Sequence, residues 1–185
     1  APNVEDGPAN PTNNYALSKL VMEKMLESYS KVFGLKGTAL RYFNTYGVGE
    51  HTKGKTASIP YSFLRQAMEG KISIYGDGKQ KRDFICVKDT VRANVLAMEK
   101  SKGFDVYNCG SGTAVEFNEV AQMAKQIAGN QTTIEHINNP LKNGYQLYTQ
   151  ADMSKAKEKL GFVPQVTFNE GMKWVYDYYS RKTIL

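Results

Sequence analysis

The chain has 185 residues and a formal net charge of +6, with 41% hydrophobic and 23% charged residues. This length and composition suit one globular domain or most of two small ones, and they argue against a transmembrane protein, because no apolar run reaches about 18 residues. The first residues, APNVEDGPANP, lack the basic and apolar stretches of a signal peptide. Lysine and arginine are spread along the chain, so no nucleic-acid partner is expected; the charge fits an anionic small molecule or a merely basic surface.

The first third predicts a helix followed by a strand. Between residues 15 and 33, apolar residues recur with a 3.6-residue period, which predicts an amphipathic helix with one buried face, ended by Gly34. The stretch GTALRYFN, residues 37–44, predicts a buried strand that leads into a Gly- and Lys-rich loop at 45–58. A helix followed by an apolar strand is half of a βαβ unit and indicates a parallel α/β sheet.

The middle of the chain predicts a helix at 59–69, a β-hairpin and a second helix. In ISIYGDGKQKRDFICV, two apolar runs flank Asp77-Gly78, which predicts two paired strands with a tight turn. The second helix, 90–100, is expected to turn four apolar residues toward the core: Val91, Val95, Leu96 and Met98. DVYNCGSG then predicts a short buried strand that ends in a glycine turn.

The last third predicts two long helices, one strand and one short helix. Their expected positions are a helix at 117–128, a strand at 132–138, a loop at 139–151, a short helix capped by Ser154 and ended by Gly161, and a last helix capped by Asn169.

The cysteines and histidines predict no metal site. Cys86 and Cys109 lie in apolar, strand-like stretches and are interpreted as buried free thiols, with a catalytic or disulfide-bonded role as the alternative. His51 and His136 are too few and too far apart to indicate metal ligands.

Tyr15 and Lys19 are the first candidate catalytic residues. They stand four residues apart, so their side chains share one face of the predicted helix. A lysine ammonium beside a tyrosine hydroxyl favours the phenolate, which otherwise forms only near pH 10. Such a phenolate can take a proton from a sugar hydroxyl while hydride leaves the same carbon. The alternative is an ordinary surface pair, since Y-x-x-x-K arises often by chance.

Four segments together resemble the extended short-chain dehydrogenase/reductase family, whose members epimerise or dehydrate nucleotide sugars. They are PTNNYALSKLVMEKML, ALRYFNTYG, IYGDGKQKRDFICVKDTVRANVLAME and VYNCGSG. The resemblance covers nearly the whole chain and implies an α/β Rossmann fold with a doubly wound parallel sheet. The Gly-rich cofactor fingerprint and the Ser/Thr of the catalytic set are absent, so the chain is expected to be a C-terminal fragment. Residues 1–57 would end the NAD(P)-binding domain and 58–185 would form mainly the substrate-binding domain, with elements near 84–112 returning to the Rossmann domain.

Two stretches narrow the resemblance to the ADP-glycero-manno-heptose 6-epimerases of lipopolysaccharide biosynthesis. They are GEHTKGKTAS at 49–58 and NPLKNGYQLYTQADMSKAK at 139–157. The alternatives left open are a UDP-glucose 4-epimerase, a dTDP-hexose 4,6-dehydratase, and a fragment that binds a nucleotide sugar without catalysis. The fragment alone is expected to be inactive.

The resemblance also implies residue roles. Catalysis would use Tyr15 as the base, Lys19 as the clamp on the cofactor ribose and Lys53 as a second base. The implied cofactor, NAD or NADP, would be bound mainly by the absent N-terminal half and here by Tyr15, Lys19, Thr45 and Lys53. The implied substrate-binding residues are Asn44, Lys55, Ser62, Tyr75, Gly76, Asp77, Gly78, Arg82 and Tyr145.

Several of these roles have simpler alternatives. Lys53 can be a solvated loop lysine, and Arg82 can form an ordinary salt bridge to Asp83 or Asp89. The subfamily usually has Ser where Lys55 stands and His where Ser62 stands, which leaves the exact sugar open. The resemblance further implies a cytoplasmic enzyme whose partner is its nucleotide-sugar substrate, and a homo-oligomer that assembles through the first helix.

Overall fold

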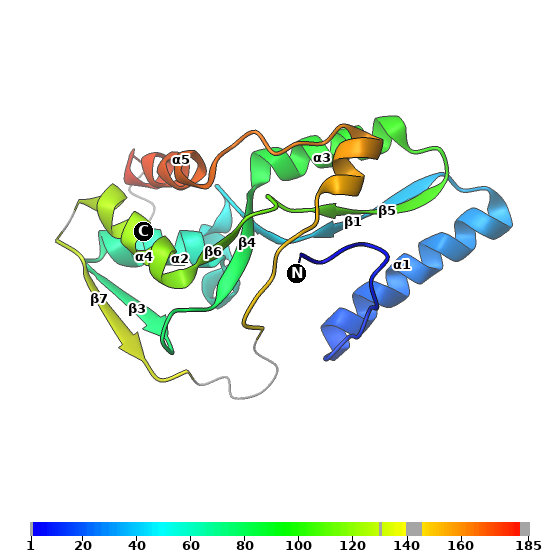
Figure 1. Cartoon of the computed structure of the whole chain (residues 1–185). Coiled ribbons are helices and arrows are strands. Elements are labelled where there is room, and N and C mark those ends of the chain that lie inside the picture. The colour runs from blue at the N-terminus through cyan, green and yellow to red at the C-terminus, as the bar shows by residue number, and fades with distance from the viewer. Residues whose placement is uncertain (1, 130, 140–145, 182–185) are drawn as a thin grey trace.

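The computed structural model describes residues 2–129, 131–139 and 146–181. Its helices and strands alternate along the chain, as predicted for an α/β protein (Figure 1). The helices are α1 (Asn14–Phe33), η1 (Glu50–Thr52), η2 (Gly54–Thr56), α2 (Ile59–Met68), α3 (Val87–Lys100), α4 (Phe117–Ala128), η3 (Ala156–Leu160) and α5 (Phe168–Arg181). The strands are β1 (Gly37–Tyr42), β2 (Asn44–Tyr46), β3 (Lys71–Tyr75), β4 (Lys81–Cys86), β5 (Phe104–Cys109), β6 (Ala114–Glu116) and β7 (Thr133–Ile137).

The described strands form three small sheets that are mainly parallel. β1 pairs with β5 and β3 with β7, both in parallel, while β4 pairs in parallel with β2 and antiparallel with β6. The predicted strands on either side of Asp77-Gly78 are therefore confirmed, but the hairpin is wrong, because β3 and β4 belong to different sheets. Two apolar runs that are adjacent in the sequence do not show whether the two strands pair with each other or with strands elsewhere in the chain.

The chain changes partner strand at Phe43. Up to Tyr42 it pairs with β5, and from Asn44 it pairs with β4. The backbone N–H of Phe43 still donates to the carbonyl of Cys109, at 3.0 Å, so the switch takes a single residue. The predicted strand at 37–44 is thus two strands. This junction places Asn44 beside the cavity described below.

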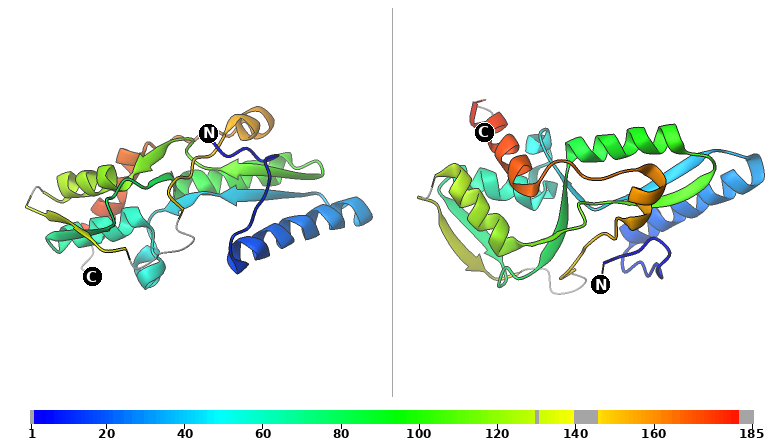
Figure 2. Two further views of the ribbon diagram at one scale, coloured as in Figure 1. Left: turned by 60° about the horizontal axis from the view of Figure 1, so that its bottom comes forward. Right: turned by 45° about the horizontal axis from the view of Figure 1, so that its top comes forward.

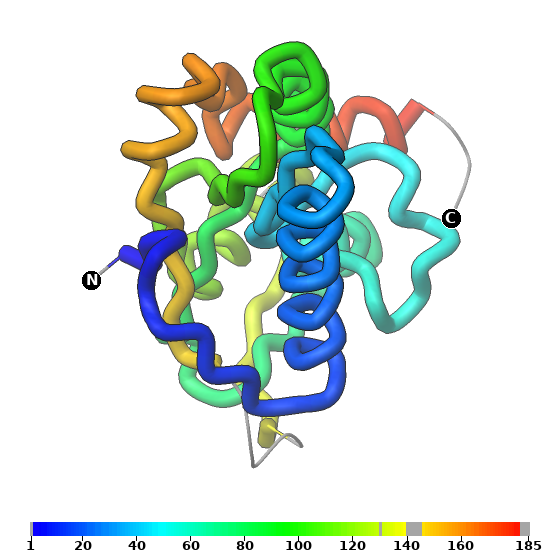
Figure 3. Tube along the Cα trace, turned by 90° about the vertical axis from the view of Figure 1, so that its right-hand side faces the viewer, coloured from blue at the N-terminus to red at the C-terminus, as the bar shows by residue number. Residues whose placement is uncertain are grey.

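Helices α1 and α3 cover opposite faces of the β1–β5 pair (Figure 2). The extent of α1 agrees with the prediction: the Asn13 side chain accepts from the N–H of Ala16 and Gly34 ends the helix with a φ of 67°. Its expected buried face is wrong for this structure, because no residue of α1 is buried. The helix packs on β1 and β5, and several of its apolar side chains, such as those of Met22, Val32 and Phe33, are exposed. Figure 3 shows the helix at the edge of the molecule.

The inward face of α3 also differs from the prediction. Val91, Val95 and Met98 are exposed, whereas Ala93 and Ala97 are buried. Small side chains let the helix approach the sheet closely, and this choice between large and small residues cannot be read from apolar periodicity alone. Of the four residues expected to face the core, Leu96 packs against a buried cluster.

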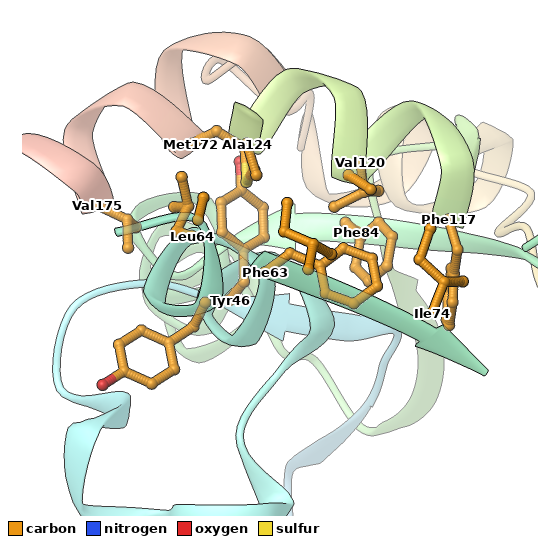
Figure 4. Close-up of a cluster of buried hydrophobic side chains, with 14 of the residues drawn as sticks. Tyr46, Phe63, Leu64, Ile74, Phe84, Phe117, Val120, Ala124, Met172 and Val175 are labelled. Atoms are coloured by element: carbon orange, nitrogen blue, oxygen red, sulfur yellow. The ribbon is translucent and has the colours of Figure 1, made fainter. Parts of the chain in front are cut away.

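The main hydrophobic core lies between α2, α4 and α5 and strands β3 and β4 (Figure 4). Phe63, Ile74, Phe84 and Val120 are almost fully buried there. Tyr46 reaches this core from β2, and burial raises the pKa of its hydroxyl above the ordinary value. A smaller cluster, which includes Ile85, Tyr107 and Cys109, fills the space between α3 and η3.

Two predicted helix caps lie two residues too late. Asp152, rather than Ser154, accepts from a helix-start amide, with 2.8 Å between its Oδ1 and the N–H of Ser154. Thr167, rather than Asn169, caps α5, since its hydroxyl accepts from Glu170 N at 3.3 Å. The predicted end of the short helix at Gly161, by contrast, is confirmed.

Both cysteines are buried free thiols, as predicted. Among the residues that the structure describes, no group of three or more His, Cys, Asp or Glu side chains could hold a metal ion. The described helices also include none that is both long enough and apolar enough to cross a bilayer.

Candidate active site

A cavity of about 810 Å³ lies between the N-terminal segment, the start of α1 and the junction of β1 with β2. Its lining includes four of the residues singled out from the sequence, Tyr15, Lys19, Asn44 and Arg82. They come from α1, β2 and β4, which are far apart in the sequence. The fold therefore brings a phenol, an ammonium, an amide and a guanidinium to one open space.

Tyr15 and Lys19 lie side by side on α1. The Lys19 Nζ is 5.2 Å from the centroid of the Tyr15 ring, and 73% of Tyr15 is exposed. The pair stands on a fixed helix start, because Asn13 caps the first turn through a 2.8 Å hydrogen bond to Ala16 N. An accessible phenol with a neighbouring cation is the arrangement needed for proton transfer to or from a bound hydroxyl.

An ion pair that the sequence did not reveal holds α1 against β1. Arg41 donates from Nε and Nη2 to both carboxylate oxygens of Glu23, at 2.9 and 2.7 Å, and from Nη1 to the carbonyl of Glu5, at 2.8 Å. The hydrogen bonds that Arg41 donates to Glu23 raise the pKa of the guanidinium. A bidentate contact of this kind fixes orientation as well as distance. Arg41 and Glu23 both line the cavity, so the pair sets the angle at which α1 presents Tyr15.

Arg82 contacts two carbonyl oxygens and an aromatic ring. Its side chain donates to the carbonyls of Lys81, at 2.9 Å, and Gln146, and its guanidinium lies 5.8 Å from the centroid of the Phe117 ring. Only 8% of Arg82 is exposed. Asp89, one of the two partners considered from the sequence, forms a salt bridge with Arg92 at 2.7 Å. Its side chain is fixed in direction while remaining part of the cavity wall.

Asp83 is the second feature that the sequence analysis missed. Its fully buried carboxylate accepts from Ser111 N and Oγ, at 2.6 and 2.7 Å, and from Gly112 N and Ala151 N, both at 2.9 Å. These donors come from the turn between β5 and β6 and from the segment before η3. Asn44 joins this group by donating to the Asp83 carbonyl, at 3.2 Å. A carboxylate inside the apolar run DFICV was the available signal, because a buried charge needs such partners.

The loop with the proposed second base lies outside this cavity. Lys53 is half exposed, and its Nζ is 3.7 Å from a carboxylate oxygen of Glu50. Glu50 itself is buried and accepts from Gly47 N, at 3.0 Å, and from Ser58 N and Oγ, at 2.7 and 2.8 Å. The Tyr179 hydroxyl of α5 accepts from Gly49 N at 2.9 Å. The loop is therefore tied to α2 and α5.

The remaining predicted residues are dispersed. The Thr45 hydroxyl lies 3.3 Å from that of Thr90, Lys55 belongs to η2, and the Ser62 hydroxyl accepts from Gln66 at 3.1 Å. Tyr75 is the last residue of β3, and Gly76, Asp77 and Gly78 form the turn that follows it. None of these residues lines the cavity in the described part of the chain. Tyr145, the last predicted contact, lies outside the described residues.

The sequence of the chain was compared with models of known protein families. Residues 1–110 match the NAD dependent epimerase/dehydratase family. The chain belongs to this family. Its Y-x-x-x-K helix and the R-D-F strand are parts of an extended short-chain dehydrogenase/reductase fold, and the sequence resemblance to nucleotide-sugar epimerases is confirmed.

Relatives in this epimerase family act on different sugars. The chain is 38% identical over 156 residues to an ADP-L-glycero-D-manno-heptose-6-epimerase of Alkalilimnicola ehrlichii, covering 80% of this chain and 48% of that protein. It is 34% identical to a UDP-glucose 4-epimerase of Lactobacillus helveticus, covering 89% of this chain and 54% of that protein. The chain thus spans about half the length of the curated relatives that it matches.

Solved structures confirm the fold. The UDP-glucose 4-epimerase of Thermotoga maritima with UDP-glucose superposes with a TM-score of 0.86 at 34% identity, over 98% of this chain and 60% of that one. The ADP-L-glycero-D-manno-heptose-6-epimerase of Helicobacter pylori gives 0.85 at 31% identity, over 98% of this chain and 55% of that one. The two substrate classes are therefore about equally similar to this chain.

Proposed function

We propose that the complete protein containing this chain is an NAD(P)-dependent epimerase of nucleotide sugars, with ADP-D-glycero-D-manno-heptose as the preferred substrate and inversion at C6. In this proposal the chain is the C-terminal part, from the catalytic helix onward. The observation that carries it is the cavity that gathers Tyr15, Lys19, Asn44 and Arg82. The heptose assignment is supported by the 38% identity to the heptose epimerase and by the resemblance of residues 49–58 and 139–157.

Tyr15 and Lys19 would perform the first proton transfer. When bound, NAD(P)⁺ supplies reversible acceptance of hydride. Tyr15, as the phenolate, takes the proton of the C6 hydroxyl as the carbinol becomes a ketone, and Lys19 stabilises the phenolate and holds the cofactor ribose. The residues present fit this group, because the pair faces an open cavity large enough for a nicotinamide and a sugar.

Lys53 would perform the second proton transfer, on the opposite face of the ketone. In the structure the Lys53 ammonium lies 3.7 Å from a carboxylate oxygen of Glu50. Lys53 would be the second acid/base group, which exchanges a proton with the sugar oxygen when hydride is added to or removed from the other face. Two groups on opposite sides allow inversion without turning the whole sugar. Because Lys53 lies outside the cavity in this structure, the proposal requires the loop at 47–58 to move toward the substrate.

The nucleotide and diphosphate would bind along one wall. Arg82 provides a planar guanidinium for phosphate oxygens, and Asn44 provides an amide for the sugar or the diphosphate. Thr45 would approach the nicotinamide through its backbone. The remaining proposed substrate contacts are Tyr75, Gly76, Asp77 and Gly78, which would surround the base and ribose, and Tyr145. Lys55 and Ser62 depart from the usual heptose pattern, and the added cation at Lys55 favours a more anionic substrate.

A UDP-hexose is the second candidate substrate. The observation in its favour is the match to the Thermotoga maritima UDP-glucose 4-epimerase over 98% of this chain. The same scaffold and the same Tyr15 chemistry would then act at C4. A third possibility is that the 185-residue chain by itself binds a nucleotide sugar without turning it over.

Product analysis on the complete gene product tests the proposal. The protein is incubated with NAD⁺ or NADP⁺ and either ADP-D-glycero-D-manno-heptose or UDP-glucose, and the epimers are separated. Conversion of the heptose that is lost in Tyr15→Phe and Lys53→Ala supports the two-base scheme, and Lys102→Ala, an exposed lysine that does not line the cavity, is the control. Turnover of UDP-glucose alone would refute the heptose assignment.

The proposal also includes a cytoplasmic homo-oligomer. Its support is the exposed apolar residues of α1, among them Val21, Met25 and Tyr29, which a second copy would cover. Light scattering of the complete protein measures its mass directly. A monomer at micromolar concentration would refute this part of the proposal.

A further inference from the structure

The turn after β3 is held by hydrogen bonds within the protein, which are present without a bound substrate. Gln80 is buried, with 5% of the residue exposed, and its Nε2 donates to the carbonyl of Tyr75 at 2.9 Å. Asn118, at the start of α4, donates from its backbone N–H to the carbonyl of Gly78 at 3.1 Å and from Nδ2 to the carbonyl of Asp77 at 3.0 Å. Three carbonyls of one turn are therefore satisfied by two residues.

The backbone of this turn requires glycine at two places. Gly76 and Gly78 have φ values of 72° and 73°, in the left-handed region that favours glycine. At Gly78 a Cβ atom would lie 2.1 Å from Oδ1 of Asn118. The Asn118 side chain thus packs directly on the Gly78 backbone, and the missing Cβ makes this contact possible.

The Asn118 amide is itself fixed in orientation. Its Nδ2 donates to Asp77 O and to the Glu116 carboxylate, at 3.0 and 3.1 Å, while its Oδ1 lies 3.0 Å from Nε2 of His136 on β7. Since both neighbours of Nδ2 are acceptors, His136 must donate through a protonated Nε2. A side chain held at both ends loses little further freedom when a ligand arrives.

We propose that Asn118, oriented by His136 and assisted by Gln80, is a positioning residue that preforms the Tyr75–Gly78 turn for the nucleotide of the substrate. This inference rests on the proposed role of that turn in nucleotide binding. The turn leads, through Lys79 and Gln80, into β4 and Arg82, which lines the cavity. A nucleotide in the turn and a diphosphate at Arg82 would therefore follow one continuous segment.

A positioning role predicts a specific kinetic pattern. Asn118→Ala removes the side-chain bond to the Asp77 carbonyl while leaving the backbone bond to Gly78, so the turn becomes looser before binding. In the complete protein KM for the nucleotide sugar should rise about fivefold, the effect of about one net hydrogen bond, with kcat unchanged. His136→Ala should give a smaller rise, which His136→Gln, a residue that can still donate, should reverse. Gln122→Ala, an exposed amide on the same helix, is the matched control.

Two measurements separate this inference from the proposed function. Amide hydrogen exchange at residues 76–80 of the 185-residue chain, without ligand, should be faster in Asn118→Ala than in wild type and Gln122→Ala. The complete wild-type protein, titrated with ADP and with UDP, should bind one of the two nucleotides. The bound nucleotide should slow amide hydrogen exchange in the turn. Faster exchange in Asn118→Ala with unchanged nucleotide affinity would overturn the inference, as would unchanged exchange or the absence of binding by both nucleotides. Nucleotide binding with the expected loss in Asn118→Ala, but no epimerisation, would refute the proposed function alone.

Discussion

Replacing the Asp83 carboxylate by an amide should destabilise the chain severely. Asp83→Asn preserves the size of the side chain but leaves a single acceptor oxygen. The wild-type oxygens divide the work: Oδ1 accepts from Ser111 N and Oγ, and Oδ2 accepts from Gly112 N and Ala151 N. In the variant an NH₂ group must face one of these pairs of donors.

The magnitude follows from the bonds that are lost. If the remaining oxygen stays with Ser111, the amide hydrogens oppose the N–H groups of Gly112 and Ala151. Each hydrogen bond to a charged group contributes about 1.5–3 kcal/mol, so losing two should lower the free energy of unfolding by about 3–6 kcal/mol. A domain of this size has a total stability of about 5–15 kcal/mol, so the variant should be close to unfolding.

Urea unfolding at pH 7, followed by far-UV circular dichroism, measures this loss. Glu99→Gln makes the same chemical change at an exposed site of α3 and should stay within about 0.5 kcal/mol of wild type. Amide exchange at Gly112 and Ala151 should also accelerate in Asp83→Asn beyond the change elsewhere. A loss under about 1 kcal/mol would refute the reasoning, since it would mean that these donors find equal partners without the carboxylate.

Three further predictions concern other buried or capping groups. Glu50→Gln should lower the free energy of unfolding by about 1.5–3 kcal/mol, because one charge-assisted bond of the loop is lost, with faster amide exchange at residues 47–58 as the second readout; equal exchange would contradict it. Hydrogen bonds from Thr167 lower the pKa of Glu170 from its ordinary value of 4.5, so this carboxylate stabilises the fold above that pH and ceases to do so as the pH falls through the folded pKa. Thermal melts should therefore show Glu170→Gln below wild type at pH 7 and level with it in strong acid, and a pH-independent gap would count against the cap. Burial raises the pKa of Cys109 to about 12 and that of Cys86 in the same direction, so neither thiol should react with a disulfide reagent at pH 8 until the chain is unfolded in urea; rapid labelling of the native chain would disprove this.

The local elements were largely predictable because their signals are local. The 3.6-residue period, the stop at Gly34 and the glycine after the short helix are properties of neighbouring residues. The helix at 117–128 agrees with α4 at both ends for the same reason. Which strands pair was not predictable in this way: the run before Asp77-Gly78 pairs with β7, some sixty residues later, because a parallel partner needs a crossover connection.

The candidate site shows the same division. The sequence alone determined that Tyr15 and Lys19 share a helix face, because the helical repeat places residues four apart together. Only the tertiary structure decided that Asn44 and Arg82 reach the same cavity while Lys53 does not, since the switch of strand partner at Phe43 and the packing of β4 set those positions. The tertiary structure also decided which groups bind the carboxylates of Glu50 and Asp83. Their partners include backbone N–H groups of other segments. Because every residue except proline has a backbone N–H, the sequence does not show which of these groups will lie beside a given carboxylate.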